Sequence, residues 1–326
     1  MRPFSSRYLR RCLVASGLLM FSFLSGAWGL AADPPAGFRI VGYLPEYRFS
    51  RFDAGHAATL TDLILFAIEP TREGEIDLGK LKNAPWPMLK EFKTRHRIRL
   101  WICMGGWGRS DNFAEAVRSE SRREHLIQSC VRLLLEHRLD GLDLDWEHPR
   151  NDEEAAGYAR LIVGLHSAFQ PHGLQLSVTI APWQRLPAEA LQAADWVQLM
   201  SYDYGQRHSS FEQAQKDVQT WLDLGIPADR LVLGMPFYGR DIEHREKSIT
   251  WQEVVRRFHP PDQIDEAGGY FFNGPGTIRR KTRHALDAGL GGVMVWEIGQ
   301  DTQDESSLLK CIQAEVQTGR AATRQK

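Results

Sequence analysis

Four acidic residues stand close together in the segment Asp140-Gly-Leu-Asp143-Leu-Asp145-Trp-Glu147. Side chains alternate between the two faces of a β-strand, so Asp143, Asp145 and Glu147 would share one face and the apolar residues the other. Carboxylates two positions apart have Cα atoms about 6.6 Å apart, and burial together with like charge raises the pKa of at least one of them. A carboxyl group that keeps its proton near neutral pH can act as a general acid. We predict that Glu147, the outermost and longest of the three, is the proton donor.

The spacing also limits how a glycosidic bond could be broken. Ordinary glycosidases place two carboxylates on opposite sides of the scissile bond. Asp145 and Glu147 project from one strand and would approach a sugar from the same side. Either a carboxylate elsewhere is the nucleophile, with Asp203 as the first candidate, or the substrate provides its own. Asp140 lies near the start of the strand, where we expect a structural role.

A cluster of carboxylates could instead bind a metal ion, because Mg²⁺ and Ca²⁺ prefer oxygen ligands. The glycines Gly289, Gly291 and Gly292 precede an apolar run, however, whereas a phosphate-binding loop follows a strand. The histidines form no HExxH pair or similar motif. We therefore expect no metal and no cofactor, and a metal-dependent glycosyl transferase is the least favoured function.

The rest of the chain alternates short apolar runs with longer amphipathic ones, which indicates strands and helices in turn. The apolar runs have the composition of strands covered on both faces. Eight are predicted as strands: Arg39–Pro45, Leu63–Glu69, Ile98–Met104, Gly141–Glu147, Leu176–Ala181, Trp196–Tyr202, Leu231–Tyr238 and Gly292–Ile298. Eight strands with helical crossovers in about 290 residues fit a single (β/α)₈ TIM-type barrel of the α/β class, for which ~250 residues are typical. The acidic face of the fourth strand then points into the barrel, which argues against a surface strand with its acids in water.

Capping and stop signals mark two of the helices. Ser121-Arg-Arg-Glu124 has the capping-box pattern and opens an amphipathic run. Asp152, followed by two glutamates, is predicted to start the next helix, which Pro171-His172-Gly173 ends.

The N-terminal segment has the pattern of an export signal. Arginines at positions 2, 7, 10 and 11 precede the apolar run Cys12 to Leu24, and small residues follow through Ala32. This order is typical of a secretory signal peptide. We predict a signal over residues 1–32, a catalytic barrel domain over residues 33–326, and a secreted or periplasmic protein. An uncleaved anchor is the alternative, since residues 12–32 could just span a bilayer.

The charge balance gives no reason to expect nucleic acid as a partner, because 40 Lys and Arg residues nearly cancel 41 Asp and Glu residues. No obligate protein partner is inferred, and no membrane contact is expected once the signal is removed. Outside the signal, Cys103, Cys130 and Cys311 are too widely spaced for a metal site. At most one disulfide can join two of them.

Several motifs together resemble those of glycoside hydrolase family 18, the chitinase family, over most of residues 33–326. The acidic segment is similar to the family signature DxxDxDxE. Val41-Gly-Tyr43 resembles the family's first strand, and Cys103-Met-Gly105-Gly106-Trp107 resembles its SxGG segment, with cysteine where serine is usual. Met200-Ser-Tyr202-Asp203 is similar to its MxYD motif, and Met294-Val-Trp296-Glu297 to its eighth strand. The segment Gly234-Met-Pro-Phe-Tyr238-Gly-Arg240 also resembles the family.

The resemblance implies a mechanism in which the substrate's own 2-acetamido oxygen attacks the anomeric carbon. Glu147 would protonate the leaving oxygen and then activate water. Asp145 would orient the acetamido group, and Asp143 would share a proton or hydrogen bond with Asp145. Tyr202 would hydrogen-bond the acetamido group, and Trp296 would form the apolar floor under the sugar. The resemblance adds further candidates for substrate binding, for which packing or structural roles are the alternative: Met200, Asp203, Tyr43, Gly105, Gly106, Tyr238 and Arg240.

Two features depart from the family pattern. His148 follows the acid where the family often has tyrosine, which leaves the aglycone contacts of that residue open. The connection Asp241 to Gly289, in which Thr250–Phe258 and Gly276–Asp287 are helix-like, is short for the α+β insertion of many members and implies a more open groove.

The leading hypothesis is hydrolysis of β-1,4-linked N-acetylglucosamine chains, as in chitin or chito-oligosaccharides. A peptidoglycan or glycan N-acetylglucosaminidase uses the same chemistry and is the second. A catalytically silent sugar-binding protein on the same barrel is the third, and the presence of Glu147 argues against it.

Overall fold

The computed structural model describes residues 37–324, and the predicted signal over residues 1–32 lies outside them. Eight parallel strands form a closed barrel in the order β1-β13-β8-β7-β6-β5-β4-β2, with β2 pairing back to β1. Their bounds are β1 (Arg39–Pro45), β2 (Asp62–Pro70), β4 (Arg99–Gly105), β5 (Gly141–Asp145), β6 (Gln175–Ile180), β7 (Trp196–Leu199), β8 (Leu231–Pro236) and β13 (Gly292–Trp296). The predicted (β/α)₈ barrel is therefore confirmed.

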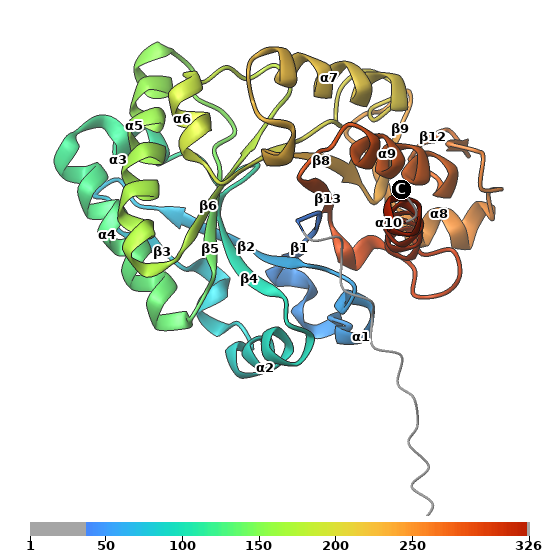
Figure 1. Cartoon of the computed structure of the whole chain (residues 1–326), viewed down its shortest axis with the longest axis horizontal. Coiled ribbons are helices and arrows are strands. Elements are labelled where there is room, and N and C mark those ends of the chain that lie inside the picture. Colours follow the sequence, from blue (N-terminus) through green and yellow to red (C-terminus); the bar gives the residue numbers. More distant parts are fainter. Residues whose placement is uncertain (1–36, 325–326) are drawn as a thin grey trace, which may run out of the picture. The chain divides into compact units, whose positions relative to one another are not determined.

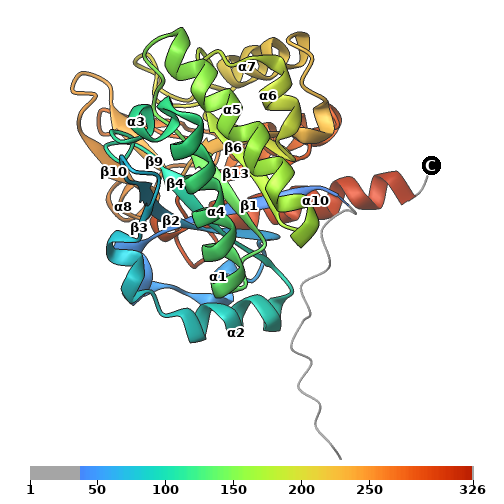
Figure 2. The same ribbon diagram turned by 90° about the vertical axis from the view of Figure 1, so that its left-hand side faces the viewer.

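Helices surround these strands (Figure 1). They are α1 (Ala54–Ala57), α2 (Trp86–His96), α3 (Phe113–Arg118), α4 (Glu120–His137), α5 (Asp152–Phe169), α6 (Ala188–Ala193), α7 (Phe211–Asp223), α8 (Trp251–Phe258), α9 (Pro275–Asp287) and α10 (Leu308–Arg324). The helix α10 packs against α9. Figure 2 shows α10, in red, on the outside of the barrel. Between residues 37 and 324, no helix is long and apolar enough to cross a membrane.

Four strands end two or three residues earlier than predicted: β5, β7, β8 and β13. β5 ends at Asp145 rather than Glu147, because the Glu147 backbone N–H donates to Ser110 Oγ at 3.1 Å instead of continuing the strand ladder. β7 ends at Leu199 rather than Tyr202, because the next two residues turn back on themselves, with Tyr202 N–H bonded to Met200 O at 2.8 Å. The changes in β5 and β7 place predicted site residues in loops at the carboxyl ends of the strands.

One helix start was also predicted wrongly. α4 begins at Glu120, and the residue that caps it is Ser119, whose Oγ accepts the Arg122 N–H at 3.3 Å. Ser121 already lies inside the helix. The start of α5 at Asp152 is confirmed, with Asn151 as its cap.

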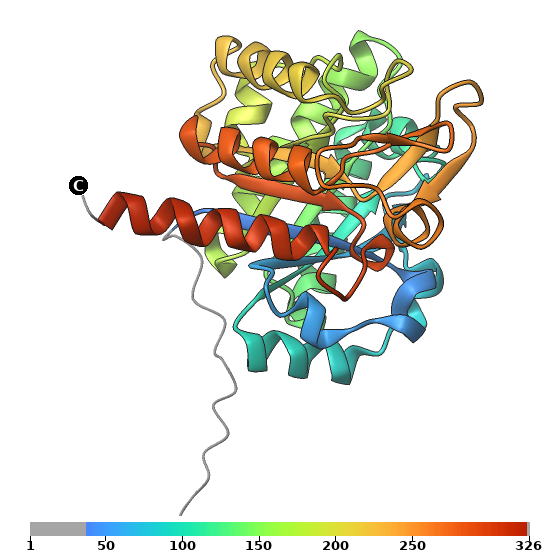
Figure 3. The same cartoon turned by 90° about the vertical axis from the view of Figure 1, so that its right-hand side faces the viewer.

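The connection after β8 is more structured than predicted. The expected helices are present as α8 and α9, but four short strands form an antiparallel sheet in the order β10-β9-β12-β11. These strands are β9 (Tyr238–Asp241), β10 (Ser248–Thr250), β11 (Glu266–Ala267) and β12 (Tyr270–Phe271), and a further short strand, β3 (Ile76–Asp77), pairs with β2. The small sheet lies beyond the carboxyl ends of the barrel strands (Figure 3).

The alternation of side chains in β5 divides the core. Leu142 and Leu144 are buried in the apolar cluster between the barrel and its helices, whereas Asp143 and Asp145 point into the barrel. Beyond the strand, Trp146 stacks on Phe113 with ring centroids 5.1 Å apart. This packing fixes the chain immediately before Glu147.

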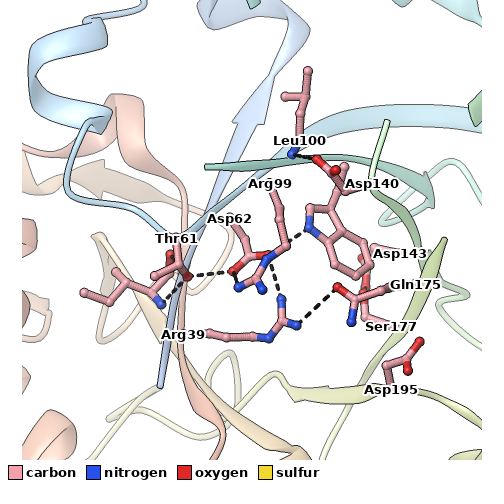
Figure 4. A network of polar contacts seen from close by, with 12 residues as sticks. Arg39, Thr61, Asp62, Arg99, Leu100, Asp140, Asp143, Gln175, Ser177 and Asp195 are labelled. Carbon is pink, nitrogen blue, oxygen red and sulfur yellow. Dashed lines mark hydrogen bonds and ion pairs between the residues drawn. The ribbon is translucent and has the colours of Figure 1, made fainter. Parts of the chain in front are cut away.

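An ion-pair network closes the opposite end of the barrel (Figure 4). Asp62 Oδ1 accepts from Arg39 Nη1 at 2.7 Å and from Trp101 Nε1 at 2.8 Å. Arg99 binds both carboxylate oxygens of Asp62, at 2.7 and 2.9 Å. The Arg39 guanidinium also lies 3.3 Å from the centroid of the Trp196 ring. Because Asp62 and Arg39 are buried, each charge depends on the other for compensation.

Replacing Asp62 with Asn should therefore destabilise the chain by about 3–5 kcal/mol, since it leaves the Arg39 cation buried beside a neutral amide. The free energy of unfolding from urea titration measures the effect. Glu91→Gln is the control, because the Glu91–Arg95 pair is exposed and worth about 0–1 kcal/mol. Equal losses in the two variants would contradict the assigned role of the network.

Candidate active site

A cavity of about 730 Å³ opens at the carboxyl ends of the barrel strands. It is lined by most of the predicted site residues, which come from five of the barrel strands or the segments that follow them: Tyr43, Asp145, Glu147, His148, Met200, Tyr202, Asp203, Tyr238, Arg240 and Trp296. Asp143, Gly105 and Gly106 lie behind these residues rather than on the cavity wall.

Asp143 is fully buried beneath the cavity floor. Tyr43 Oη donates to its Oδ2 at 2.7 Å, and Ser177 Oγ donates to its Oδ1 at 2.6 Å. Gln198 Nε2 also donates to Oδ1, at 2.9 Å. Thr179 Oγ1 lies 3.0 and 3.1 Å from the two oxygens. Neutral donors from three strands thus hold the Asp143 carboxylate in one position.

Asp145 is the next carboxylate toward the cavity and has a different environment. Its Oδ1 is buried and has no hydrogen-bond partner within the described part of the chain. Burial, followed by the charges of Glu147 and Asp143, raises the pKa of Asp145 well above its usual range. Asp145 therefore has one buried oxygen without a partner and a strong tendency to hold a proton.

Glycines allow this close packing beside Asp145. Gly105 and Gly106 have φ angles of +103° and +100°, which strongly favour glycine. A Cβ at Gly105 would lie 2.3 Å from the Asp145 carbonyl oxygen, and one at Gly106 would lie 2.3 Å from the Phe66 ring. The two glycines shape the wall of the site through the backbone and do not contact a ligand from the cavity surface.

Glu147 lies at the cavity wall with its side chain largely buried. Burial, together with the charge of Asp203, raises the pKa of Glu147 to about 7. The backbone N–H of Trp107 hydrogen-bonds the carboxyl group and opposes this shift. A carboxyl group with this pKa can donate a proton near neutral pH and take one back.

Asp203, in contrast to Glu147, is held in its ionised form. Arg240 Nε and Nη2 each donate to one of its oxygens, both at 2.6 Å. Although burial acts against ionisation, hydrogen bonds from Arg240 and His208 keep the pKa of Asp203 well below its usual range. Asp203 is a paired, ionised carboxylate, which makes it a weaker candidate nucleophile than the sequence suggested.

Aromatic rings form much of the cavity surface. Trp296 packs against Tyr43 and Phe66, with centroid distances of 5.4 and 4.6 Å. On another side, the rings of Tyr202 and Tyr238 lie edge to face at 6.4 Å. A floor of this kind suits a pyranose ring, whose C–H faces pack on aromatic surfaces.

Sequence reasoning missed part of the cavity lining. Tyr47, Trp107 and Trp183 line the cavity while 55%, 81% and 60% exposed. Trp107 stands three residues and Trp183 two residues beyond a predicted strand's carboxyl end, and this position was the signal available. Phe66, Arg109, Arg245 and Gln300 also line the cavity, and no motif marked them.

Two further expectations concern metals and cysteines. Within residues 37–324, no group of three or more His, Cys, Asp or Glu side chains is arranged to hold a metal ion. Cys103, Cys130 and Cys311 are all buried and free. Cys103 lies opposite Asp143 in the β4–β5 ladder, where its thiol takes part in the surroundings of that carboxylate.

Fold and cavity together define the class: a (β/α)₈ barrel with a cavity lined by carboxyl groups at the carboxyl ends of its strands. Residues 39–301 match the model of glycosyl hydrolases family 18, and the chain belongs to this family. Among its relatives, Chitinase 1 of Aphanocladium album is 25% identical over 276 residues, covering 67% of this chain. The chain spans 65% of the length of that relative.

Solved structures agree on the fold. The GH18 chitinase ChiB of Flavobacterium johnsoniae is 28% identical, with a TM-score of 0.77 over 86% of this chain and 94% of the other. A chitinase-like agglutinin of Robinia pseudoacacia is 22% identical, with a TM-score of 0.75 over 85% and 99% of the two chains. At that identity the likeness concerns the fold alone.

The raised pKa of Glu147 has a consequence for stability. Between the ordinary value of 4.5 and about 7, the folded chain holds a proton that the unfolded chain has lost, so this residue's stabilising contribution falls as pH rises. Glu147→Gln removes the titration. Relative to wild type, the free energy of unfolding of this variant should increase by about 2–3 kcal/mol between about pH 4.5 and pH 8.

Urea titrations at the two pH values measure this difference, with Glu91→Gln as an exposed control that should track wild type at both. If the difference in free energy of unfolding between Glu147→Gln and wild type did not change with pH, Glu147 would not have the raised pKa.

Proposed function

We propose that this chain is a retaining glycosidase that cleaves β-1,4-linked N-acetylglucosamine chains, such as chitin or chito-oligosaccharides, with help from the substrate's acetamido group. The observation that carries the proposal is the contrast between carboxylates around one cavity. Glu147 retains a proton to about pH 7, whereas Asp203 is ionised and paired with Arg240. Membership of the family and the names of its chitinase relatives support the substrate class.

In the proposed first step, Glu147 gives its proton to the glycosidic oxygen while the acetamido oxygen of the substrate attacks the anomeric carbon. The bond from that carbon to the leaving oxygen breaks, and an oxazolinium ion forms. Asp145, which lines the cavity and whose Oδ1 has no partner within the described part of the chain, accepts the acetamido N–H and stabilises the positive charge. In the second step Glu147 removes a proton from water, which attacks the anomeric carbon and restores the acetamide.

The remaining residues position the sugar. Trp296 forms the apolar floor, and Tyr202 hydrogen-bonds the acetamido group from the loop after β7. Asp143 does not bind substrate in this scheme, because its oxygens are occupied by donors from the barrel. Its charge adds to burial and to the charge of Glu147 in raising the pKa of Asp145.

The exposed rings extend the binding surface beyond one sugar. Tyr47, Trp107 and Trp183 lie at the cavity wall, and aromatic faces pack well on consecutive pyranose rings. Exposed aromatic rings beside a catalytic carboxyl group favour a chain of sugars over a single one.

The decisive experiment is turnover of an aryl glycoside of N,N′-diacetylchitobiose. We expect Glu147→Gln to lower kcat by about 10²–10⁴-fold, the contribution of a general acid–base, with little change in KM. Glu91→Gln, on the exposed face of α2, should match wild type. A folded wild-type protein that released no aryl group from any N-acetylhexosaminide would refute the function.

A second substrate tests the nucleophile. With the N-acetyl group replaced by a free amine, the rate should fall by about 10³-fold or more, because intramolecular attack is lost. A matched substrate lacking the acetyl group only on the distal sugar should be cleaved almost normally. Undiminished cleavage of the first analogue would mean that an enzyme carboxylate is the nucleophile.

A further inference from the structure

His148 is the residue that departs from the family pattern, and the proposed chemistry gives it no role. It follows the proton donor in the chain and lines the same cavity. Its Nε2 lies 3.8 Å from Glu147 Oε2, and both side chains are largely buried. The distance is about 1 Å longer than a hydrogen bond, so a small rotation of the Glu147 side chain would close it.

Gln184 determines which nitrogen of His148 carries the proton. Its Oε1 lies 3.5 Å from the backbone N–H of Ala181, which can only donate. The same oxygen lies 3.1 Å from His148 Nδ1. If the amide were flipped, its NH₂ group would face the Ala181 N–H, and two hydrogen-bond donors would oppose each other. With the amide in this orientation, the neutral imidazole carries its hydrogen on Nδ1, and Nε2, which faces Glu147, is left as an acceptor.

The surroundings keep His148 in this neutral form. Burial lowers the pKa of His148, and the hydrogen bond to Gln184 only partly opposes that shift. The Trp183 ring covers the imidazole edge to face, with centroids 4.4 Å apart. Near the proposed working pH of Glu147, the imidazole is uncharged and can only accept at Nε2.

We propose that His148 is a positioning residue for Glu147: its bare Nε2 accepts the hydrogen of the Glu147 carboxyl group in the resting protein and releases it to the glycosidic oxygen. This inference rests on the proposed function. A hydrogen bond accepted from the protonated carboxyl group stabilises that neutral form, so His148 helps Glu147 to retain its proton. No further proton source is needed, because the water used in the second step returns one proton to Glu147.

Other charged groups also face this pair, and a test must separate their effects. They come from β5, the loop after β4, the loop after β7, and the hairpin between β9 and β10: Asp145, Arg109, Asp203, Arg240, Arg245 and Glu246. None of them contacts Gln184 through a hydrogen bond that the described residues show. Variants at Gln184 therefore change the imidazole tautomer while leaving these charges in place.

The direct test is nuclear magnetic resonance. Histidine ¹⁵N spectra, assigned by the signal lost in His148→Asn, should show the neutral ring protonated at Nδ1, with the midpoint of its titration below the ordinary value of about 6.5. In Gln184→Leu the Nδ1 preference should disappear. A wild-type ring that carries its proton on Nε2 would overturn the proposal, whatever the activity of the protein.

The carboxyl titration of Glu147, followed by ¹³C resonances, gives the second readout. In His148→Phe and in Gln184→Leu its pKa should fall by about half a unit to one unit, the size of one neutral hydrogen bond. The alkaline midpoint of the kcat profile should move down by the same amount. Arg185→Ala is the matched control, because Arg185 bonds the carbonyls of Pro182 and Gln184 in the same loop without touching the imidazole.

The outcomes are distinguishable once thermal melting shows that each variant is folded. Unchanged Glu147 titration in both His148→Phe and Gln184→Leu refutes the role of His148, even if the wild type cleaves the chitobioside. Absence of cleavage by the wild type refutes the proposed function, and the two spectra still decide whether His148 holds the proton of Glu147.

Discussion

The carboxylate of Asp143 lies at the centre of the barrel, and the strands around it must compensate its charge. The side chains that hydrogen-bond it are neutral and come from β1, β6 and β7. This requirement fixes the register of the sheet, because a slip of one residue in β5 would bring its leucines inside and its carboxylates against the outer helices. In this closed barrel a partly polar inner face accommodates the acidic strand.

Three levels of carboxylates follow one another along the barrel interior, and each is compensated differently. At the closed end, Asp62 is bound by two arginines. In the middle, Asp143 receives only neutral donors. At the open end, Asp145 has an unpartnered oxygen and Glu147 keeps a proton to about pH 7. Along this row compensation decreases toward the cavity, and the pKa values of Asp145 and Glu147 are both raised there.

The sequence predicts the barrel and the inward face of β5 because both depend on local alternation and on apolar periodicity. It also locates ten cavity-lining residues, since side chains at the carboxyl ends of barrel strands converge. The cap of α4 was placed two residues late because Ser119 and Ser121 both fit a capping pattern, and only the backbone geometry separates them. The small sheet after β8 escaped prediction because its strands are two to four residues long and carry no clear alternation.

What the sequence could not predict are the partners of each acid. Asp203 and Glu147 are both acidic residues in loops after barrel strands, and nothing local indicates that one would bind Arg240 while the other stays unpaired. Their pairing depends on β9, which returns to the cavity from a segment 37 residues away in the chain. The opposite pKa shifts of the two acids therefore arise from the tertiary structure.

The same difference in pairing bears on the nucleophile. Of the carboxylates on the cavity wall, Asp203 is neutralised by Arg240, and Glu246 lies exposed in the turn between β9 and β10. Asp145 extends from the strand that leads to Glu147 and so approaches a sugar from the side of the acid. An enzyme carboxylate on the opposite face of the sugar is not evident in residues 37–324, and this geometry supports a nucleophile that belongs to the substrate. The barrel alone would not lead to that conclusion, because a chitinase-like agglutinin has the same fold. The argument rests on how each carboxylate is paired.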